Sequence, residues 1–277
     1  MSMEVSPFSK MFTDKRIIIV GSAFGHGEYL SKSFHFQNAQ VLLIDSSEKV
    51  HELKKKLGKR AESYVLDVRD SQKIKSLSDD IGSVDGIIYL PRARIRKPFF
   101  DLTSSEFDEE ISISLRGALL FAQNFSLKMN LNKKNYPFII TISSILAQVI
   151  GSESVSYHVS KAGLEQLTRY LAVELGSYGI RVNSVALGWT IKEEQMENFY
   201  SELNFEYRLM AENLHALPYI GTSEDVFQAV AFLASEKAKF ITGQIINLDG
   251  GITIQEQSHL YLNKMKNFLN PNSCDEI

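Results

Sequence analysis

The sequence predicts an α/β fold in which one doubly wound parallel β-sheet carries helices on both faces, as a single domain. The chain has 277 residues and is 44% hydrophobic and 23% charged, which is enough apolar material for one sizeable core. Short apolar runs alternate with longer amphipathic stretches, which is the order of βαβ units. The chain shows no short-period repeat, so a solenoid is disfavoured.

Seven short apolar runs are expected to form the strands, because they are rich in β-branched residues and regularly spaced. Right-handed crossovers between such strands place helices on both faces of the sheet. The seven runs are Arg16–Val20, Gln40–Ile44, Ser63–Leu66, Gly86–Leu90, Phe138–Ile142, Arg181–Ala186 and Gln244–Leu248.

Between the strands, the clearest helical period covers Val155–Tyr178, and a second long helix is expected over Ser104–Met129. Thr190–Leu217 carries several aromatic residues without a strand signal. It is either a lid over a site or an ordinary helical excursion that packs its own aromatics. Residues 252–277 suggest a short amphipathic helix with a polar end, on the spacing of Leu260, Leu262, Met265 and Phe268.

Composition excludes several classes of function. Thirty Lys and Arg against 33 Asp and Glu give a formal net charge of -3, which does not favour nucleic acid or an anionic membrane as partner. The single cysteine, Cys274, cannot form an intramolecular disulfide, so a cytoplasmic location is expected. We expect a main domain over residues 15–252, an N-terminal extension over 1–14 and a C-terminal tail over 253–277.

A glycine-rich turn follows the first strand and leads into a helix that is expected to start near Glu28. Glycines allow a tight turn and a close backbone approach to a pyrophosphate, and the helix N-terminus supplies unpaired N–H groups. The turn therefore predicts a dinucleotide site. Its expected contacts are Gly21, Ser22, Phe24, Gly25 and Gly27.

Two aspartates at strand ends are candidates for the adenosine half of that dinucleotide. Asp45 ends the second run, where a carboxylate accepts hydrogen bonds from both ribose hydroxyls and repels a 2'-phosphate. NAD is therefore expected rather than NADP. The alternative is that Asp45 turns away to cap the following helix and leaves Ser46 and Ser47 to hydrogen-bond a phosphate. Asp67 is placed to reach the adenine amino group, although a turn role suits it equally.

The catalytic candidates are Tyr157 and Lys161, which the spacing i to i+4 places on one helix face. A phenol is a poor base at neutral pH, but a neighbouring ammonium favours the phenolate. Ser144 follows a strand at the edge where open α/β sheets bind ligands, so its hydroxyl is a candidate for holding a substrate oxygen. A strand-end serine that caps a turn is the alternative.

These residues recur together in an order and spacing that resemble the classical short-chain dehydrogenase/reductase family, from about Lys15 to Ile252. The matching segments are the glycine turn, Asp67-Val68, Ser143-Ser144, Tyr157 to Gly163, Arg181 to Val185, Phe240 to Gln244 and Asp249 to Gly251. The resemblance implies a Rossmann-type fold and a nicotinamide cofactor. It also implies that Tyr157 is the general acid/base, that Lys161 binds the nicotinamide ribose, and that Ser144 orients the substrate.

The chain departs from the family pattern at three places. Tyr89-Leu90-Pro91-Arg92 stands where the family has Asn-Asn-Ala-Gly, and Leu187-Gly188 replaces Pro-Gly. Ser114 stands at the family's helix asparagine, and the expectation is that its hydroxyl holds a relay water. The basic residues from Arg92 to Lys97 are either a clamp for an anionic group or a solvated loop.

The resemblance implies an oxidoreductase that transfers hydride between NAD(H) and a carbonyl or secondary alcohol of a small molecule, as a homodimer or homotetramer. Two alternatives stay open: an NADPH-dependent 3-oxoacyl-carrier-protein-type reductase, and a nicotinamide-binding regulator without turnover. The six histidines show no metal-ligand spacing, so no metal is expected. His158 is expected to point away from the site, because i+1 leaves the Tyr157 face.

Overall fold

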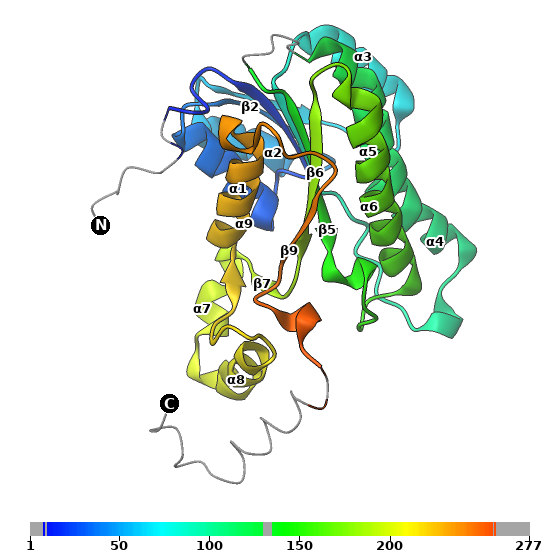
Figure 1. Cartoon of the computed structure of the whole chain (residues 1–277), viewed down its shortest axis with the longest axis vertical. Helices are drawn as coiled ribbons and strands as arrows, with labels where there is room; N and C mark the ends of the chain where they lie inside the picture. The colour runs from blue at the N-terminus through cyan, green and yellow to red at the C-terminus, as the bar shows by residue number, and fades with distance from the viewer. Residues whose placement is uncertain (1–7, 9, 130–134, 257, 259–277) are drawn as a thin grey trace.

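A computed structural model describes residues 8, 10–129, 135–256 and 258 (Figure 1). Its main sheet has seven parallel strands in the order β3-β2-β1-β4-β5-β6-β9. The bounds of these strands are β1 Arg16–Val20, β2 Gln40–Asp45, β3 Ala61–Val65, β4 Gly86–Tyr89, β5 Phe138–Ser144, β6 Arg181–Leu187 and β9 Ile245–Leu248. All seven expected strands are confirmed, with ends that differ by one or two residues.

Helices cover both faces of the sheet, as Figure 1 shows. One buried cluster joins β1 and β2 to α1 (Gly25–Phe36), α2 (Lys49–Leu57) and α9 (Ser223–Ala234). A second cluster joins the other face to α3 (Ser71–Ile81), α5 (Gly117–Phe125) and α6 (Val155–Gly176). The doubly wound single-domain fold is therefore confirmed.

Helix α1 starts at Gly25, three residues before the start expected near Glu28. Two of the turn's glycines therefore belong to its first turn, and their backbone N–H groups point out of the helix N-terminus.

The long helix expected over Ser104–Met129 is interrupted. The structure has α4 over Ser104–Ile111, a π-helical turn over Ser112–Arg116, α5, and a 3₁₀ turn over Ser126–Lys128. Inside the π-helical turn, the carbonyl oxygen of Ile113 accepts a hydrogen bond from the Tyr89 hydroxyl. An added Cβ at Gly117 would overlap that hydroxyl. A tyrosine on the neighbouring strand thus occupies the space beside the interrupted helix.

The segment after β6 contains a short strand that the sequence did not predict, β7 (Thr190–Ile191), paired with β8 (Gly221–Thr222). Two short helices follow β7, α7 (Met196–Phe199) and α8 (Phe205–Asn213). Phe199 packs with Ile191, Ala211 and Ile220 in a small core of its own. The segment therefore packs its own aromatics, and Ile191, Phe199 and Tyr207 also line the large cleft beside the sheet.

Buried side chains tie the ends of the domain to its core. Phe12, in the expected N-terminal extension, is fully buried and lies 4.9 Å from Phe34, ring centroid to centroid. The Arg181 guanidinium donates to the carbonyls of Leu233 and Ala234 at the end of α9, and burial lowers the pKa of Arg181 to about 10. The amphipathic helix and polar end expected beyond residue 258, with Cys274, lie outside the described residues.

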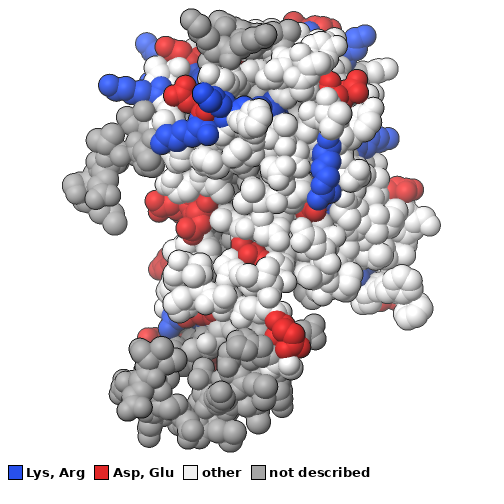
Figure 2. Space-filling view, viewed as in Figure 1, with Lys and Arg blue, Asp and Glu red and all other residues white. Residues whose placement is uncertain are grey.

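In the described part of the chain, no helix is both long and apolar enough to cross a membrane. On the face shown in Figure 2, positive and negative side chains are interspersed and large areas are uncharged.

Candidate active site

A cleft of about 1220 Å³ opens at the carboxyl ends of the central strands. The strand order reverses between β1 and β4, which is the switch point where open α/β sheets bind ligands. Residues that end or directly follow six strands line the cleft: Val20, Asp45, Leu66, Leu90, Ser144 and Leu187.

The glycine turn forms one wall of the cleft, with Gly21, Phe24 and Gly27 among its lining residues. Gly21 adopts a positive φ of 83° and its N–H donates to Ile44 O at 2.8 Å. An added Cβ at Gly27 would overlap the Gly21 carbonyl, so only glycine allows this close packing of helix on turn. The open turn at a helix N-terminus fits a pyrophosphate.

Two of the expected cofactor contacts do not line the cleft. The Ser22 side chain is fully buried, and its hydroxyl donates to Ile44 O at 3.2 Å, so it attaches the turn to β2 instead. Gly25 lies beneath the Lys192 side chain, whose Cδ is 2.8 Å from the position that a Cβ would take. In this structure both residues support the turn from the side away from the cleft, and their contact with a cofactor stays a prediction.

Asp45 and Asp67 both line the far end of the cleft, with Val68 beside them. The Asp45 carboxylate accepts from the N–H groups of Ala23 at 2.9 Å and Ser47 at 3.0 Å. It does not cap α2, whose N-cap position is Glu48. The carboxylate therefore stays at the cleft edge, tied to the glycine turn.

Asp67 has a partner that the sequence did not suggest. The Arg69 guanidinium donates to both carboxylate oxygens of Asp67, with Nη2 to Oδ2 at 2.6 Å and Nε to Oδ1 at 3.0 Å. These hydrogen bonds lower the pKa of Asp67. Asp67 also closes a turn, with its carbonyl accepting from Asp70 N–H, so the turn role is seen here and the adenine contact stays a prediction.

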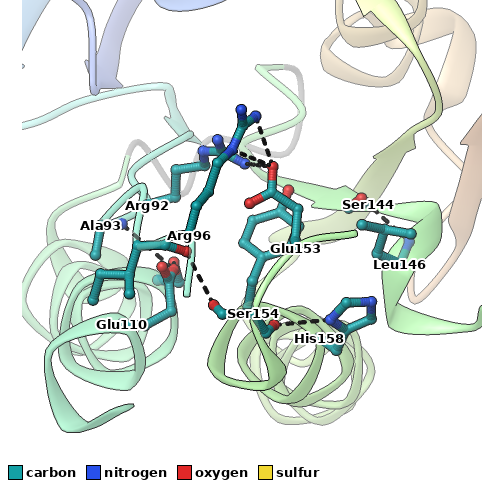
Figure 3. Close-up of polar contacts among 12 residues, drawn as sticks. Arg92, Ala93, Arg96, Glu110, Ser144, Leu146, Glu153, Ser154 and His158 are labelled. Carbon is teal, nitrogen blue, oxygen red and sulfur yellow. Dashed lines mark hydrogen bonds and ion pairs between the residues drawn. The ribbon is translucent and has the colours of Figure 1, made fainter. Parts of the chain in front are cut away.

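The structure brings the three catalytic candidates into the same cleft. Ser144 ends β5 and its Oγ accepts from Leu146 N–H at 3.2 Å (Figure 3), so the hydroxyl hydrogen is left for another acceptor. Tyr157 lies in the first turn of α6. The Lys161 Nζ is 5.6 Å from the Tyr157 ring centroid and donates to Ile142 O at 2.9 Å.

Lys161 is almost fully buried, and burial lowers its pKa to about 8. The carboxylate of Glu110 opposes that shift, and the cationic Arg92 adds to it. Glu110 is itself fully buried at the end of α4, and its Oε2 has no hydrogen-bond partner among the described residues. A buried carboxylate, Glu110, therefore acts electrostatically on the buried Lys161.

Ser114, the residue expected to hold a relay water, lies inside the protein next to Glu110. Ser114 is fully buried and is not among the residues that line the cleft. Its hydroxyl donates to Glu110 Oε1 and lies 3.3 Å from Pro91 O. The hydroxyl hydrogen is thus used by a carboxylate, so Ser114 positions Glu110, and its relay role stays a prediction.

The departure at Tyr89 to Arg92 changes the wall opposite Tyr157. Tyr89 is fully buried, and burial raises its pKa far above the ordinary value. The Arg92 guanidinium lies 4.9 Å from the Tyr157 ring centroid and 3.4 Å from Glu153 Oε1. Arg92, the last residue of this segment, therefore places a guanidinium group over the ring of Tyr157, the candidate catalytic tyrosine.

Comparison with known proteins agrees with this geometry. The sequence profile of a family described as enoyl-(acyl carrier protein) reductase matches residues 21–253. The 3-oxoacyl-[acyl-carrier-protein] reductase of Rickettsia typhi is 31% identical over 245 residues, covering 87% of this chain and 98% of that protein. The chain belongs to the classical short-chain dehydrogenase/reductase family. It is an NAD(P)-dependent oxidoreductase.

Two further proteins are similar to this chain over most of its length. The 7alpha-hydroxysteroid dehydrogenase of Bacteroides fragilis is 30% identical over 256 residues, covering 88% of this chain and 96% of its own. The crystal structure of a short-chain dehydrogenase from Leptospira borgpetersenii with bound NAD+ superposes with a TM-score of 0.77 at 26% identity, covering 91% of this chain and 98% of that one.

Two histidines serve the architecture of this dehydrogenase site. His26 in the glycine turn pairs through Nδ1 with Ser223 Oγ at 2.8 Å and through Nε2 with Thr190 Oγ1 at 2.9 Å. Burial, and then Lys192, lower the pKa of His26 to about 4. His158 points away from the cleft as expected, with Nε2 accepting from Gly151 N–H at 3.0 Å.

Among the residues that the structure describes, no group of three or more His, Cys, Asp or Glu is placed to hold a metal ion.

Proposed function

We propose that this enzyme uses NAD(H) to interconvert a carbonyl and a secondary alcohol on a small molecule, with Tyr157, Ser144 and Lys161 as its reacting and orienting groups. The observation that carries this proposal is the shared cleft, in which the Tyr157 to Lys161 turn faces the glycine turn. The bound nicotinamide supplies or accepts the hydride. The catalytic domain then corresponds to residues 15–252, with 1–14 and 253–277 as its flanking segments.

In the reductive direction, the Tyr157 hydroxyl donates its proton to the substrate oxygen as that oxygen gains negative charge. The Ser144 hydroxyl donates a hydrogen bond to the same oxygen, since the bond it accepts from Leu146 N–H leaves its hydrogen unused. The Lys161 ammonium adds positive charge beside the phenol. Oxidation uses the same groups in reverse.

We infer that NAD is preferred over NADP because of the adenosine end of the cleft. The Asp45 carboxylate lines that end, where it accepts hydrogen bonds from ribose hydroxyls and repels a 2'-phosphate. The Lys49 ammonium lies 4.8 Å from the Phe24 ring centroid and is not a lining residue of the cleft. The Leptospira relative, whose structure contains NAD+, supports the same preference.

The cofactor preference is tested by comparing kcat/KM for NADH and NADPH with one accepted carbonyl, in wild type and Asp45→Ala. Lost hydroxyl contacts and added charge repulsion cost a few kcal/mol, so NADH is expected to win by on the order of a hundredfold. The ratio of kcat/KM for NADH to that for NADPH should fall in Asp45→Ala. It should stay unchanged in Asp70→Ala, because Asp70 does not line the cleft. A wild-type preference for NADPH would overturn the assignment of Asp45.

A carrier-linked 3-oxoacyl reductase is the second candidate, because the Rickettsia typhi relative bears that name and the loop after β4 is basic. NADPH preference together with turnover of a carrier-bound substrate would favour it. Turnover by wild type that is lost in Tyr157→Phe excludes a regulator that only binds the cofactor.

A homodimer or homotetramer is proposed from apolar side chains on the outer face of α6. Val159, Tyr170 and Val173 are 45%, 62% and 84% exposed, which is the kind of face that helices bury between subunits. Size-exclusion chromatography with light scattering tests this, and a monomer at micromolar concentration would contradict it. The cytoplasmic location inferred from the lone cysteine stays a prediction.

A further inference from the structure

Four basic side chains line the catalytic end of the cleft, and we call them the basic cluster. They come from two segments, the loop after β4 and the segment after β7, which follow the carboxyl ends of their strands. The basic cluster consists of Arg92, Arg94, Arg96 and Lys192.

One member of the basic cluster, Arg92, contacts the candidate catalytic tyrosine. Arg92 stacks on Tyr157, with 4.9 Å between its guanidinium carbon and the ring centroid. That side chain is 28% exposed, so the cation is neither free in solvent nor sealed in the core. A substrate whose oxygen reaches the Tyr157 hydroxyl therefore comes within reach of the guanidinium.

The cluster has more positive charge than its carboxylate partners neutralise. Glu153 is its only ion-pair partner among the described residues, and Oε1 of that one side chain serves both Arg96 at 2.9 Å and Arg92 at 3.4 Å (Figure 3). Arg94 forms no hydrogen bond or ion pair within the described part of the chain, although it lines the cleft. A cation in this position is available to a ligand.

Two further features mark this part of the cleft, one electrostatic and one in the backbone. Burial and the neighbouring Arg94 lower the pKa of Lys192, while Glu194 only partly opposes them. Arg94 also has a φ of 61°, which a residue with a Cβ adopts rarely and at a cost on the order of 1 kcal/mol. Backbone strain of this kind tends to mark ligand-binding positions.

The cluster divides between cofactor and substrate. The Lys192 side chain crosses Gly25 at the N-terminus of α1, which is the pyrophosphate position. Arg92 and Arg94 instead follow β4, with Arg92 on the Tyr157 ring. Lys192 therefore lies on the pyrophosphate side, Arg92 lies at the Tyr157 ring, and Arg94 is a near neighbour of Lys192 that lines the same cleft.

We propose that the substrate carries an oxyanionic group, a carboxylate or a phosphate, which Arg92 and Arg94 bind beside the reacting carbonyl or alcohol. This substrate class rests on the proposed function, because it places the reacting oxygen at Tyr157. Guanidinium groups suit it, since they offer paired N–H donors to two oxygens of one anion.

Matched substrate pairs test the proposal with NADH as the reductant. Acetoacetate is compared with methyl acetoacetate, and dihydroxyacetone phosphate with dihydroxyacetone, so the two pairs also distinguish a carboxylate from a phosphate. We expect the charged member of one pair to be favoured in kcat/KM by about tenfold or more. Arg94→Gln should remove most of that preference through KM, whereas the charge-matched control Lys55→Gln on α2 should keep it.

A binding measurement gives an answer that does not depend on turnover. With NAD+ at saturation, acetoacetate or dihydroxyacetone phosphate should raise the melting temperature of wild type but not of Arg94→Gln, and the neutral partners should raise neither. Failure of both anions to bind, or equal shifts in wild type and Arg94→Gln, would overturn the subsite. Absence of any shift with NAD+ alone would instead contradict the proposed function, so the two failures are distinguishable.

Discussion

The buried carboxylate of Glu110 should control the charge state of Lys161, and Glu110→Gln tests this with little change in shape. Glu110 accepts the Ser114 hydroxyl through Oε1 and opposes the burial that lowers the pKa of Lys161. A glutamine keeps an acceptor for Ser114 while removing the negative charge. The variant therefore separates electrostatics from packing.

The size of the effect follows from the lysine's environment. The pKa of Lys161 falls from 10.5 to about 8, which at about 1.4 kcal/mol per unit disfavours the buried ammonium by roughly 3 kcal/mol. An opposite charge a few ångströms away typically shifts a pKa by about one to three units. Because Glu110 favours the charged lysine, its removal should lower the pKa of Lys161 further, by about one unit or more.

The assay is the pH dependence of kcat/KM for an accepted carbonyl, together with the NAD+ dissociation constant over the same pH range. The alkaline decrease caused by deprotonation of Lys161 should move to lower pH in Glu110→Gln. Asp108→Asn removes an equal charge from the exposed face of the same helix and should leave both profiles unchanged. Unchanged profiles in Glu110→Gln, or equal shifts in both variants, would refute the coupling.

Two further predictions concern His26 and Lys161. The pKa of His26 lies at about 4 in the fold, below its ordinary 6.5, so the stability from its neutral ring is present above pH 6.5 and is lost as pH falls toward 4. Thermal unfolding should therefore show wild type losing up to roughly 3 kcal/mol more than His26→Gln across that interval, and parallel curves for the two proteins would disprove it. Lys161→Ala should lower kcat and weaken NAD+ binding together, and an unchanged NAD+ dissociation constant would leave Lys161 with a structural role only.

The strands and the site's central residues could be predicted because they depend on local pattern. Strand ends were missed because sheet hydrogen bonding does not stop where the apolar run of one strand does. β5 continues through two serines to Ser144, and β6 continues to Leu187, which pairs with Ser144. Edge strand β3 begins at Ala61, two residues before the predicted start at Ser63. The charged Glu62 hid this start in the sequence, but an edge strand can carry an exposed Glu62. Tyr157 and Lys161 could be found because a spacing of four residues places them on one helix face, and Ser144 because it ends a strand at the ligand-binding edge of the sheet.

What the sequence did not reveal depends on contacts between distant segments. The helix expected over Ser104–Met129 is broken at the turn where the Ile113 carbonyl accepts a hydrogen bond from the Tyr89 hydroxyl. Tyr89 belongs to a strand that is distant in the sequence. No pattern in the sequence singled out Glu110, but the fold buries it, and its charge acts on Lys161. Lys192 lies 167 positions after Gly25 in the chain, yet its side chain covers that glycine.

The most direct test of the account is Tyr157→Phe, measured as kcat for an accepted carbonyl or alcohol alongside the NAD+ dissociation constant. The substitution removes the hydroxyl that exchanges a proton with the substrate oxygen and keeps the ring on which Arg92 stacks. We predict that kcat falls by about 10²- to 10⁴-fold while NAD+ binding changes little. A variant that keeps more than about a tenth of the wild-type rate would contradict the assignment of Tyr157 as the general acid/base.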